Sequence, residues 1–247
     1  MKILFSPSEA KTSGGRDQSF DQNSFIFPEL YNKRKEIVDK YNSMIKSEND
    51  EKLSKLFGIK NPQKFKQYKK NIYSQPTMKT IERYSGIAFE YLDYQTLTNS
   101  QKSYIDQNTM IFSNLFGPIL AGDQLLPEYK LKQGEKLNDF VIEKFYKEHF
   151  STAIDNWLSD EPFLDLRAGF YNKFYKTTTK EYTTLKFLKN KKVVSHWAKA
   201  YRGLVLRALA QNSIQNMDEF MNMEISGLEI SEIIKIKNMR QINFNIL

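Results

Sequence analysis

The chain has 247 residues, and its 40% hydrophobic and 27% charged residues are typical of a folded protein with a packed core rather than a disordered chain. Lys and Arg number 37 against 29 Asp and Glu, which gives a formal net charge of +8. Cysteine is absent and the only histidines are His149 and His196, which excludes disulfides, thiolate metal sites, cysteine nucleophiles and His-rich metal centres.

The sequence opens with a short apolar run, Lys2–Phe5, that predicts a buried strand. Ser6 and Pro7 begin a loop at its carboxyl end, where open sheets often bind ligands. Ser6 and Lys11 are candidate site residues, because a lysine beside hydroxyl groups can hold an anion or, with a lowered pKa, act as a base. The run is too short for a signal peptide and no window reaches the length of a membrane-spanning helix, so we expect a cytoplasmic protein with no membrane partner.

The next segments predict helices. Apolar residues at three- and four-residue spacing predict an amphipathic helix over Pro28–Ile45. Two shorter helices, Lys52–Phe57 and Asn61–Ile72, flank Gly58, whose freedom to adopt a positive φ ends the first one tightly. This pattern predicts a helix-hairpin-helix subregion at about residues 50–72, which is too small to bury a core of its own.

The helix-hairpin-helix segment is strongly basic. Seven lysines and no acid lie between Lys52 and Lys70. Lysines and the start of a helix attract phosphate oxygens whatever the base sequence, so the segment predicts contacts to a DNA backbone. The alternative is an ordinary glycine helix cap beside solvated lysines. Its candidate site residues are Lys55, Gly58, Lys60 and Lys64.

The middle of the chain alternates buried and polar segments. Gly86–Leu92 and Met110–Leu120 are dense apolar runs that predict buried elements. Tyr129–Lys132 alternates and predicts an exposed strand, and Phe140–Trp157 has helical spacing. Asp123 lies in a loop between these segments, and structural pairing is the simpler explanation for its carboxylate.

Strand and helix patterns continue to the end of the chain. Phe163–Leu166, Lys192–Trp197 and Arg240–Leu247 predict strands, and Ala198–Gln211 predicts a helix. No repeat or long linker divides the sequence. We therefore predict a single compact domain over residues 1–247, of the mixed α/β class, with a central mixed sheet and surrounding helices.

A second basic segment interleaves cations with aromatic rings. Arg167–Arg207 holds eleven basic residues and one acid, Glu181. Grooves that hold nucleotides use such rings for stacking and such cations for phosphate, although burial of the rings in the core is the alternative. Two concentrated basic segments indicate a polyanionic partner such as nucleic acid, and solvated charge runs are the other interpretation. The candidates here are Tyr171, Lys173, Lys199 and Arg202.

Several short motifs, taken in order, resemble the YaaA peroxide-stress family over nearly the whole chain. They are Ser6–Thr12 after the first strand, Ser113–Gly117 with Asp123 and Tyr129–Leu131, and Ala198–Gly203. The helix-hairpin-helix segment falls where that family carries one. The resemblance implies a compact mixed α/β fold with a basic cleft, binding of double-stranded DNA, and a role in limiting peroxide damage by lowering free intracellular iron.

Carried over by position, the family's cleft would use eight side chains, together with Gly58 and the lysines near it. They are Ser6, Lys11, Asp123, Lys130, Tyr171, Lys173, Lys199 and Arg202. This sequence departs from the family pattern at Gly122 and at Arg167–Gly169, which leaves the chemistry near Asp165 open. The resemblance supplies no reaction.

Two functions of different classes follow. The first is a stress protein that binds duplex DNA through phosphate contacts at the hairpin and the cleft. The second is an enzyme acting on a nucleotide or nucleic-acid base in a pocket formed by Ser6, Lys11, Asp123, Lys199 and Arg202. A scaffold for a metal or a protein partner is a third option. We expect no cofactor and no metal, and the expected partners are duplex DNA and a small anionic or nucleotide ligand.

Overall fold

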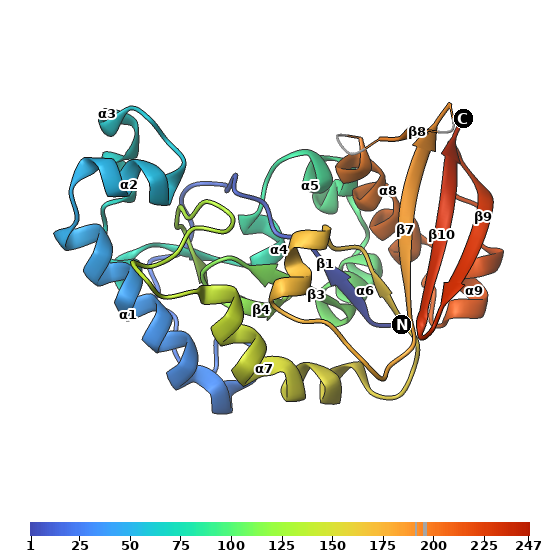
Figure 1. Ribbon diagram of the computed structural model, residues 1–247, viewed down its shortest axis with the longest axis horizontal. Helices are drawn as coiled ribbons and strands as arrows, with labels where there is room; N and C mark the ends of the chain where they lie inside the picture. Colours follow the sequence, from blue (N-terminus) through green and yellow to red (C-terminus); the bar gives the residue numbers. More distant parts are fainter. Residues whose placement is uncertain (191, 195–196) are drawn as a thin grey trace.

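A mixed sheet runs through the molecule. The computed structural model describes residues 1–190, 192–194 and 197–247 (Figure 1). Its main sheet has eight strands, in the order β4-β3-β1-β6-β7-β10-β9 with β8 paired to β7. Their bounds are β1 Ile3–Phe5, β3 Thr109–Ser113, β4 Gly117–Leu120, β6 Phe163–Asp165, β7 Tyr182–Lys189, β8 Lys192–Val193, β9 Leu228–Ile236 and β10 Met239–Ile246. A separate pair joins β2, Thr77–Met78, to β5, Leu126–Pro127.

The centre of the sheet is parallel and its edges are antiparallel. β1 pairs in parallel with β3 on one side and β6 on the other, and the parallel pairing continues through β7 to β10. β4 and β9 are antiparallel to their neighbours. All three residues of β1 are buried, as a strand covered on both faces requires. The predicted mixed α/β class and central mixed sheet are confirmed.

Helices cover the sheet, with β7, β10 and β9 at one end of the molecule and α2 and α3 at the other (Figure 1). Their bounds are α1 Tyr31–Ser47, α2 Asp50–Phe57, α3 Pro62–Phe65, α4 Thr80–Arg83, α5 Ile87–Leu92, α6 Asn99–Asn108, α7 Ile142–Leu158, α8 Ala198–Gln211 and α9 Met217–Asn222. Short 3₁₀ turns lie at Pro28–Leu30, Lys66–Tyr68, Ile72–Ser74, Tyr94–Thr96 and Gly169–Lys173. Among the described residues, no helix is both long enough and apolar enough to cross a membrane.

The long helices follow the predicted amphipathic patterns. α1 buries Ile37, Val38 and Tyr41 against the core, and α7 buries Phe150 and Ile154. Helix α8 packs on α5, α6 and β7. The predicted helices at residues 28–45, 140–157 and 198–211 are therefore confirmed, and the apolar face of each helix packs against the core.

Three predicted elements differ from the structure. Tyr129–Lys132 forms no strand. Tyr129 and Leu131 are only 3% and 1% exposed, and the Tyr129 hydroxyl forms a hydrogen bond of 2.7 Å with the hydroxyl of buried Ser113. The helix predicted to reach Ile72 ends at Phe65. Strand β8 covers only Lys192–Val193 of the predicted strand, and Ser195 and His196 lie outside the described residues.

The helix-hairpin-helix assignment stays a prediction. Helix α3 has a single turn, and the chain then continues through the 3₁₀ turn Lys66–Tyr68. A further turn starts at Ile72, where the Asn71 side chain accepts the N–H of Tyr73 and caps a new element. The local caps thus divide a segment whose apolar spacing alone predicts one continuous helix.

Candidate functional site

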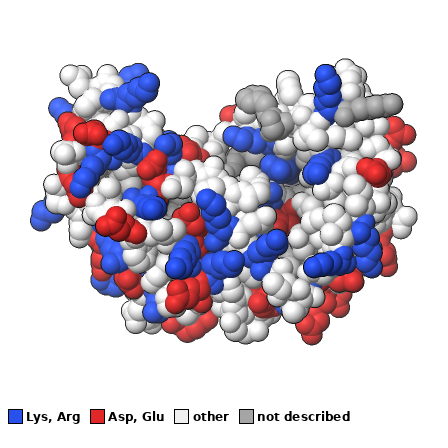
Figure 2. Space-filling view, viewed as in Figure 1, with Lys and Arg blue, Asp and Glu red and all other residues white. Residues whose placement is uncertain are grey.

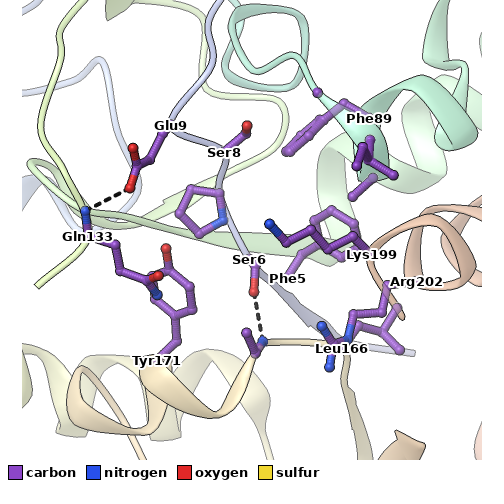
Figure 3. Close-up of a pocket in the computed structure, with 15 residues that line it drawn as sticks. Phe5, Ser6, Ser8, Glu9, Phe89, Gln133, Leu166, Tyr171, Lys199 and Arg202 are labelled. Carbon is purple, nitrogen blue, oxygen red and sulfur yellow. Dashed lines mark hydrogen bonds between the residues drawn. The ribbon is translucent and has the colours of Figure 1, made fainter. Parts of the chain in front are cut away.

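A cavity of about 400 Å³ lies at the carboxyl ends of the neighbouring parallel strands β1 and β6 (Figure 3). The chain leaves β1 toward β3 on one side and later returns to β6 on the other. Such a switch in strand order opens a crevice between the loops that follow the two strands, and open α/β sheets bind ligands there. We call this cavity, with its lining from these loops, α5 and α8, the switch-point pocket.

Hydrogen bonds join the loops that form the pocket. The Ser6 hydroxyl after β1 accepts the N–H of Ala168 after β6 at 2.8 Å, which leaves its own proton free to donate (Figure 3). The Glu9 carboxylate accepts the N–H of Gln133 at 3.0 Å and lies 3.5 Å from the ammonium of Lys130. These contacts hold polar groups at fixed positions around the cavity.

A buried ion pair supports the loop after β6. Arg167 donates to both carboxylate oxygens of Asp165, at 2.9 and 2.7 Å, and to the carbonyl of Tyr171 at 3.2 Å. Its guanidinium lies 4.4 Å from the centre of the Phe112 ring. A buried carboxylate is stable only with such partners, and Arg167, the nearest cation along the chain, supplies them to Asp165.

Helix α8 brings two cations to the pocket. Lys199 and Arg202 are one turn apart and both line the cavity (Figure 3). Arg202 is half-buried, and burial lowers its pKa while the charge of Asp165 opposes that shift. Within the described parts of the chain, the Arg202 guanidinium donates no hydrogen bond and forms no ion pair. A desolvated cation of this kind favours an anionic ligand.

The close approach of α8 to α5 depends on Gly203. A β-carbon at this position would lie 2.0 Å from the carbonyl oxygen of Ala88 in α5, so only glycine lets the two helices meet. Ala88 and Phe89 line the pocket together with the cations of α8. Gly203 therefore determines how closely Arg202 approaches the apolar residues Ala88 and Phe89.

Lys11 lies behind the pocket loop rather than in the pocket lining. Its ammonium donates to the carbonyl of Ser8 at 3.3 Å and lies 3.9 Å from the centre of the Tyr129 ring and 5.2 Å from that of Tyr84. Burial and the nearby charge of Lys130 lower the pKa of Lys11 to about 7. The lowered pKa of Lys11 fits a base, but Lys11 does not line the cavity.

Asp123 lies away from the switch-point pocket. Its carboxylate accepts the N–H groups of Leu120 at 2.8 Å and Ile26 at 3.1 Å. Burial raises the pKa of Asp123 to about 6 despite these two bonds. The arrangement fits the structural pairing considered for this residue, in which the carboxylate joins the turn after β4 to the segment before α1.

The structure thus brings together part of the predicted cleft. Ser6, Tyr171, Lys199 and Arg202 line one cavity, and Lys130 adjoins it through Glu9. Lys173 is exposed beside the ring of Phe170, at 5.0 Å. The pocket also uses Glu9, Gln133 and Phe89, which were not among the candidates. Glu9 follows the first strand closely and could have been included, whereas only the folded chain places the other two.

At the hairpin, several lysines are already paired with acids. Lys52 bonds to Glu48 at 2.9 Å, Lys55 to Glu51 at 2.9 Å, and Lys69 lies 3.5 Å from Asp50. Lys60 and Lys64 are exposed and form no ion pair with any described residue. Lys66 and Lys70 are likewise exposed and outside the ion pairs of the described residues, so four of the seven lysines remain available to a partner.

Backbone groups at the hairpin turn are used within the protein. Gly58 has φ +66°, its N–H donates to the carbonyl of Lys55, and the Lys132 side chain packs over it. The Asn61 side chain accepts the N–H of Gln63 at the start of α3. Contacts from this element to a phosphate would thus come chiefly from lysine side chains.

The two basic regions face a common hollow. Figure 2 shows one face of the molecule hollowed between the part over α2 and α3 and the part over α8, with Lys and Arg side chains on both sides. The described residues contain no group of three or more His, Asp or Glu side chains placed to hold a metal ion.

Comparison with known proteins finds relatives along most of the chain. Residues 1–233 match the family described as "Peroxide stress protein YaaA". An uncharacterized protein of Campylobacter jejuni is 47% identical over 241 residues, which are 98% of this chain and 97% of the relative. A UPF0246 protein of Corynebacterium efficiens is 34% identical over 217 residues, 85% of each chain. A UPF0246 protein of Fusobacterium nucleatum is 26% identical over 245 residues, 94% of each chain.

Proposed function

Because this chain belongs to the peroxide stress protein YaaA family, we propose that it binds double-stranded DNA in the cytoplasm during peroxide stress and helps to limit iron-driven damage. The duplex would lie in the hollow between α2–α3 and α8 (Figure 2). Contacts would go to phosphates, which makes binding independent of base sequence.

The observation that carries this proposal is the position of cations on two sides of one hollow. Lys60 and Lys64 provide charge on the hairpin side, where Lys52, Lys55 and Lys69 are paired with acids. Lys199 and Arg202 provide it on the α8 side. Cations concentrated on both sides of a hollow raise the local concentration of a polyanion.

Phosphate binding also links to iron. Protein cations that neutralise phosphates release the small cations condensed on DNA. Ferrous ions held by phosphates would be among those released, so the covered segment would carry less iron where peroxide reacts. The protection would then require no metal ligand in the protein.

A salt titration of duplex binding tests the proposal. Log affinity should fall linearly with log salt, with a slope of about −0.9 for each neutralised phosphate. The double variant Lys60→Gln/Lys64→Gln should have a shallower slope, whereas Lys35→Gln, which removes a lysine paired with Asp39 at 2.6 Å, should match the wild type. Absence of duplex binding even in dilute buffer would refute the proposal.

A further inference from the structure

We propose that the switch-point pocket binds one nucleoside monophosphate unit, with the phosphate at Lys199 and Arg202 and the base directed toward Glu9. This assignment rests on the proposed function, to which it adds a ligand class for the cavity beside the DNA-binding hollow. The unit has two chemical sources, a free nucleotide or an unpaired nucleotide of a DNA strand. Three features of the cavity support it: a cationic end, an acceptor end and an apolar wall.

The cationic end is completed by Ser6. The Ser6 hydroxyl accepts from Ala168 and keeps its proton for a ligand oxygen, and it lies between Glu9 and the α8 cations in Figure 3. Arg202 differs from most of the buried and half-buried arginines, because among the described residues only Arg202 and Arg240 of this group donate no side-chain hydrogen bond. Four others donate at least three side-chain hydrogen bonds each within the protein: Arg34, Arg83, Arg167 and Arg207. A phosphate would give Arg202 the partners that these residues already have.

The acceptor end determines the orientation of the ligand. The Glu9 carboxylate lies on the opposite side of the cavity from Lys199 and Arg202 (Figure 3). Gln133 donates its N–H to one carboxylate oxygen, and the Lys130 ammonium lies 3.5 Å from the other. Each oxygen has a second lone pair, so the fixed carboxylate keeps acceptor capacity for a ligand N–H. A carboxylate repels an anion and accepts from an amine or ring N–H, so a ligand with both groups has one favourable orientation. A nucleotide carries both.

The wall and the size fit a single nucleotide. Phe89 and Leu166 contribute apolar surface to the lining, on the side of Lys199 and Arg202 in Figure 3. The volume of about 400 Å³ lies within the range of about 300–1,000 Å³ typical of small-ligand pockets. A duplex cannot enter a cavity of this size, so a nucleotide of DNA would reach it only when unpaired and turned out of the stack.

Calorimetric titration of the full-length protein with AMP, GMP, CMP and UMP tests the assignment. At least one of them should bind, and Arg202→Gln and Glu9→Gln should each weaken it by about tenfold or more, since each removes a charged hydrogen bond. Arg16→Gln is the matched control, because Arg16 is exposed and its charge lies outside the lining. Thermal melting of each variant checks that it folds.

Inorganic phosphate and free amino acids are the comparison ligands. Nucleotides that bind no tighter than phosphate, with no effect of Glu9→Gln, would show a plain anion site and overturn the assignment. Binding of an amino acid in preference to every nucleotide would overturn it as well, because a carboxylate and an ammonium also match the two polar ends.

DNA carrying one unpaired nucleotide distinguishes the two sources. If the unit comes from DNA, this duplex binds more tightly than a fully paired one, and Glu9→Gln removes the difference without changing affinity for the paired duplex. If the unit is free, the nucleotides bind and both duplexes bind equally. Failure of the nucleotides and equal binding of the duplexes would refute the assignment, while the proposed function fails only if the paired duplex does not bind.

Discussion

Fully buried arginines in this protein are held by backbone carbonyl groups from several segments of the chain. Arg83 is fully buried and donates to the carbonyls of Leu126 at 3.1 Å, Gly14 at 2.9 Å and Pro76 at 2.8 Å. It thereby joins the loop after β1 to β5. From the sequence alone such an arginine is expected at the surface, because its burial depends on carbonyl groups that only folding brings together.

Asp123 provides a pH test of one buried charge. Its folded pKa of about 6 lies above the ordinary value of 3.8, so between these values the folded state binds more protons than the unfolded state. The free energy of unfolding should therefore fall as pH rises from about 4 through the folded pKa of Asp123, and this contribution should become constant only above about pH 7, where the folded carboxyl is fully ionised. Asp123→Asn keeps an oxygen to accept from Leu120 and Ile26 but does not titrate.

Urea unfolding of wild type and Asp123→Asn at several pH values measures this contribution. The stability of the wild type relative to the variant should decrease from about pH 4 to about pH 7 and then level off. A constant difference across that range would show that Asp123 is not desolvated in the folded protein, and the role of the carboxylate as a buried acceptor would be wrong.

At the scale of elements, amphipathic patterns predict the long helices well and strands β7 and β9 poorly. Strand β7 lies inside the sheet and buries Thr183, Leu185 and Phe187 in alternation, but Lys186 and Lys189 favour assignment to a basic surface segment. Strand β9 has isoleucines at 230, 233 and 236, all partly exposed, and a register shift opposite Asn243/Phe244 interrupts its period of two. An edge strand with a bulge buries little, so its sequence carries a weak signal.

Gly203→Ala tests the contact between α5 and α8. In a free helix this change is stabilising by about 1 kcal/mol, because alanine has the higher helix propensity. Here the new β-carbon would lie 2.0 Å from the Ala88 carbonyl, so we expect a net loss of about 1–3 kcal/mol of unfolding free energy from overpacking. Urea unfolding measures it, with Gly169→Ala as the control, because no atom lies within 4 Å of a β-carbon at Gly169.

Nucleotide binding gives this prediction a second measurement. A shift of α8 away from α5 moves Lys199 and Arg202 relative to Phe89, so affinity at the switch-point pocket should fall with stability. If Gly203→Ala is as stable as the wild type, the close approach of the two helices does not determine the fold.

At the scale of the whole molecule, the sequence predicts where charge is concentrated but overestimates how much is free. The segment Lys52–Lys70 contains no acidic residue. However, three of its lysines pair with acids that lie just before it, namely Glu48, Asp50 and Glu51. The fold then places the remaining charge across a hollow from α8 (Figure 2). Part of the cleft was predictable, because Ser6 follows a strand end and Lys199 and Arg202 share one helix. Their position relative to Glu9 and Phe89 depends on tertiary packing.

The arrangement of two basic sides predicts how their contributions to DNA binding combine. If one duplex contacts both sides, Lys199→Gln should make the salt slope shallower by about 0.9, and Lys60→Gln/Lys64→Gln by up to about twice that amount. The triple variant should then lose the sum of the two changes, since each contact releases its own counterions. If Lys60→Gln/Lys64→Gln/Lys199→Gln has the same salt slope as Lys60→Gln/Lys64→Gln, the duplex contacts only the α2–α3 side. If it has the same slope as Lys199→Gln, the duplex contacts only the α8 side.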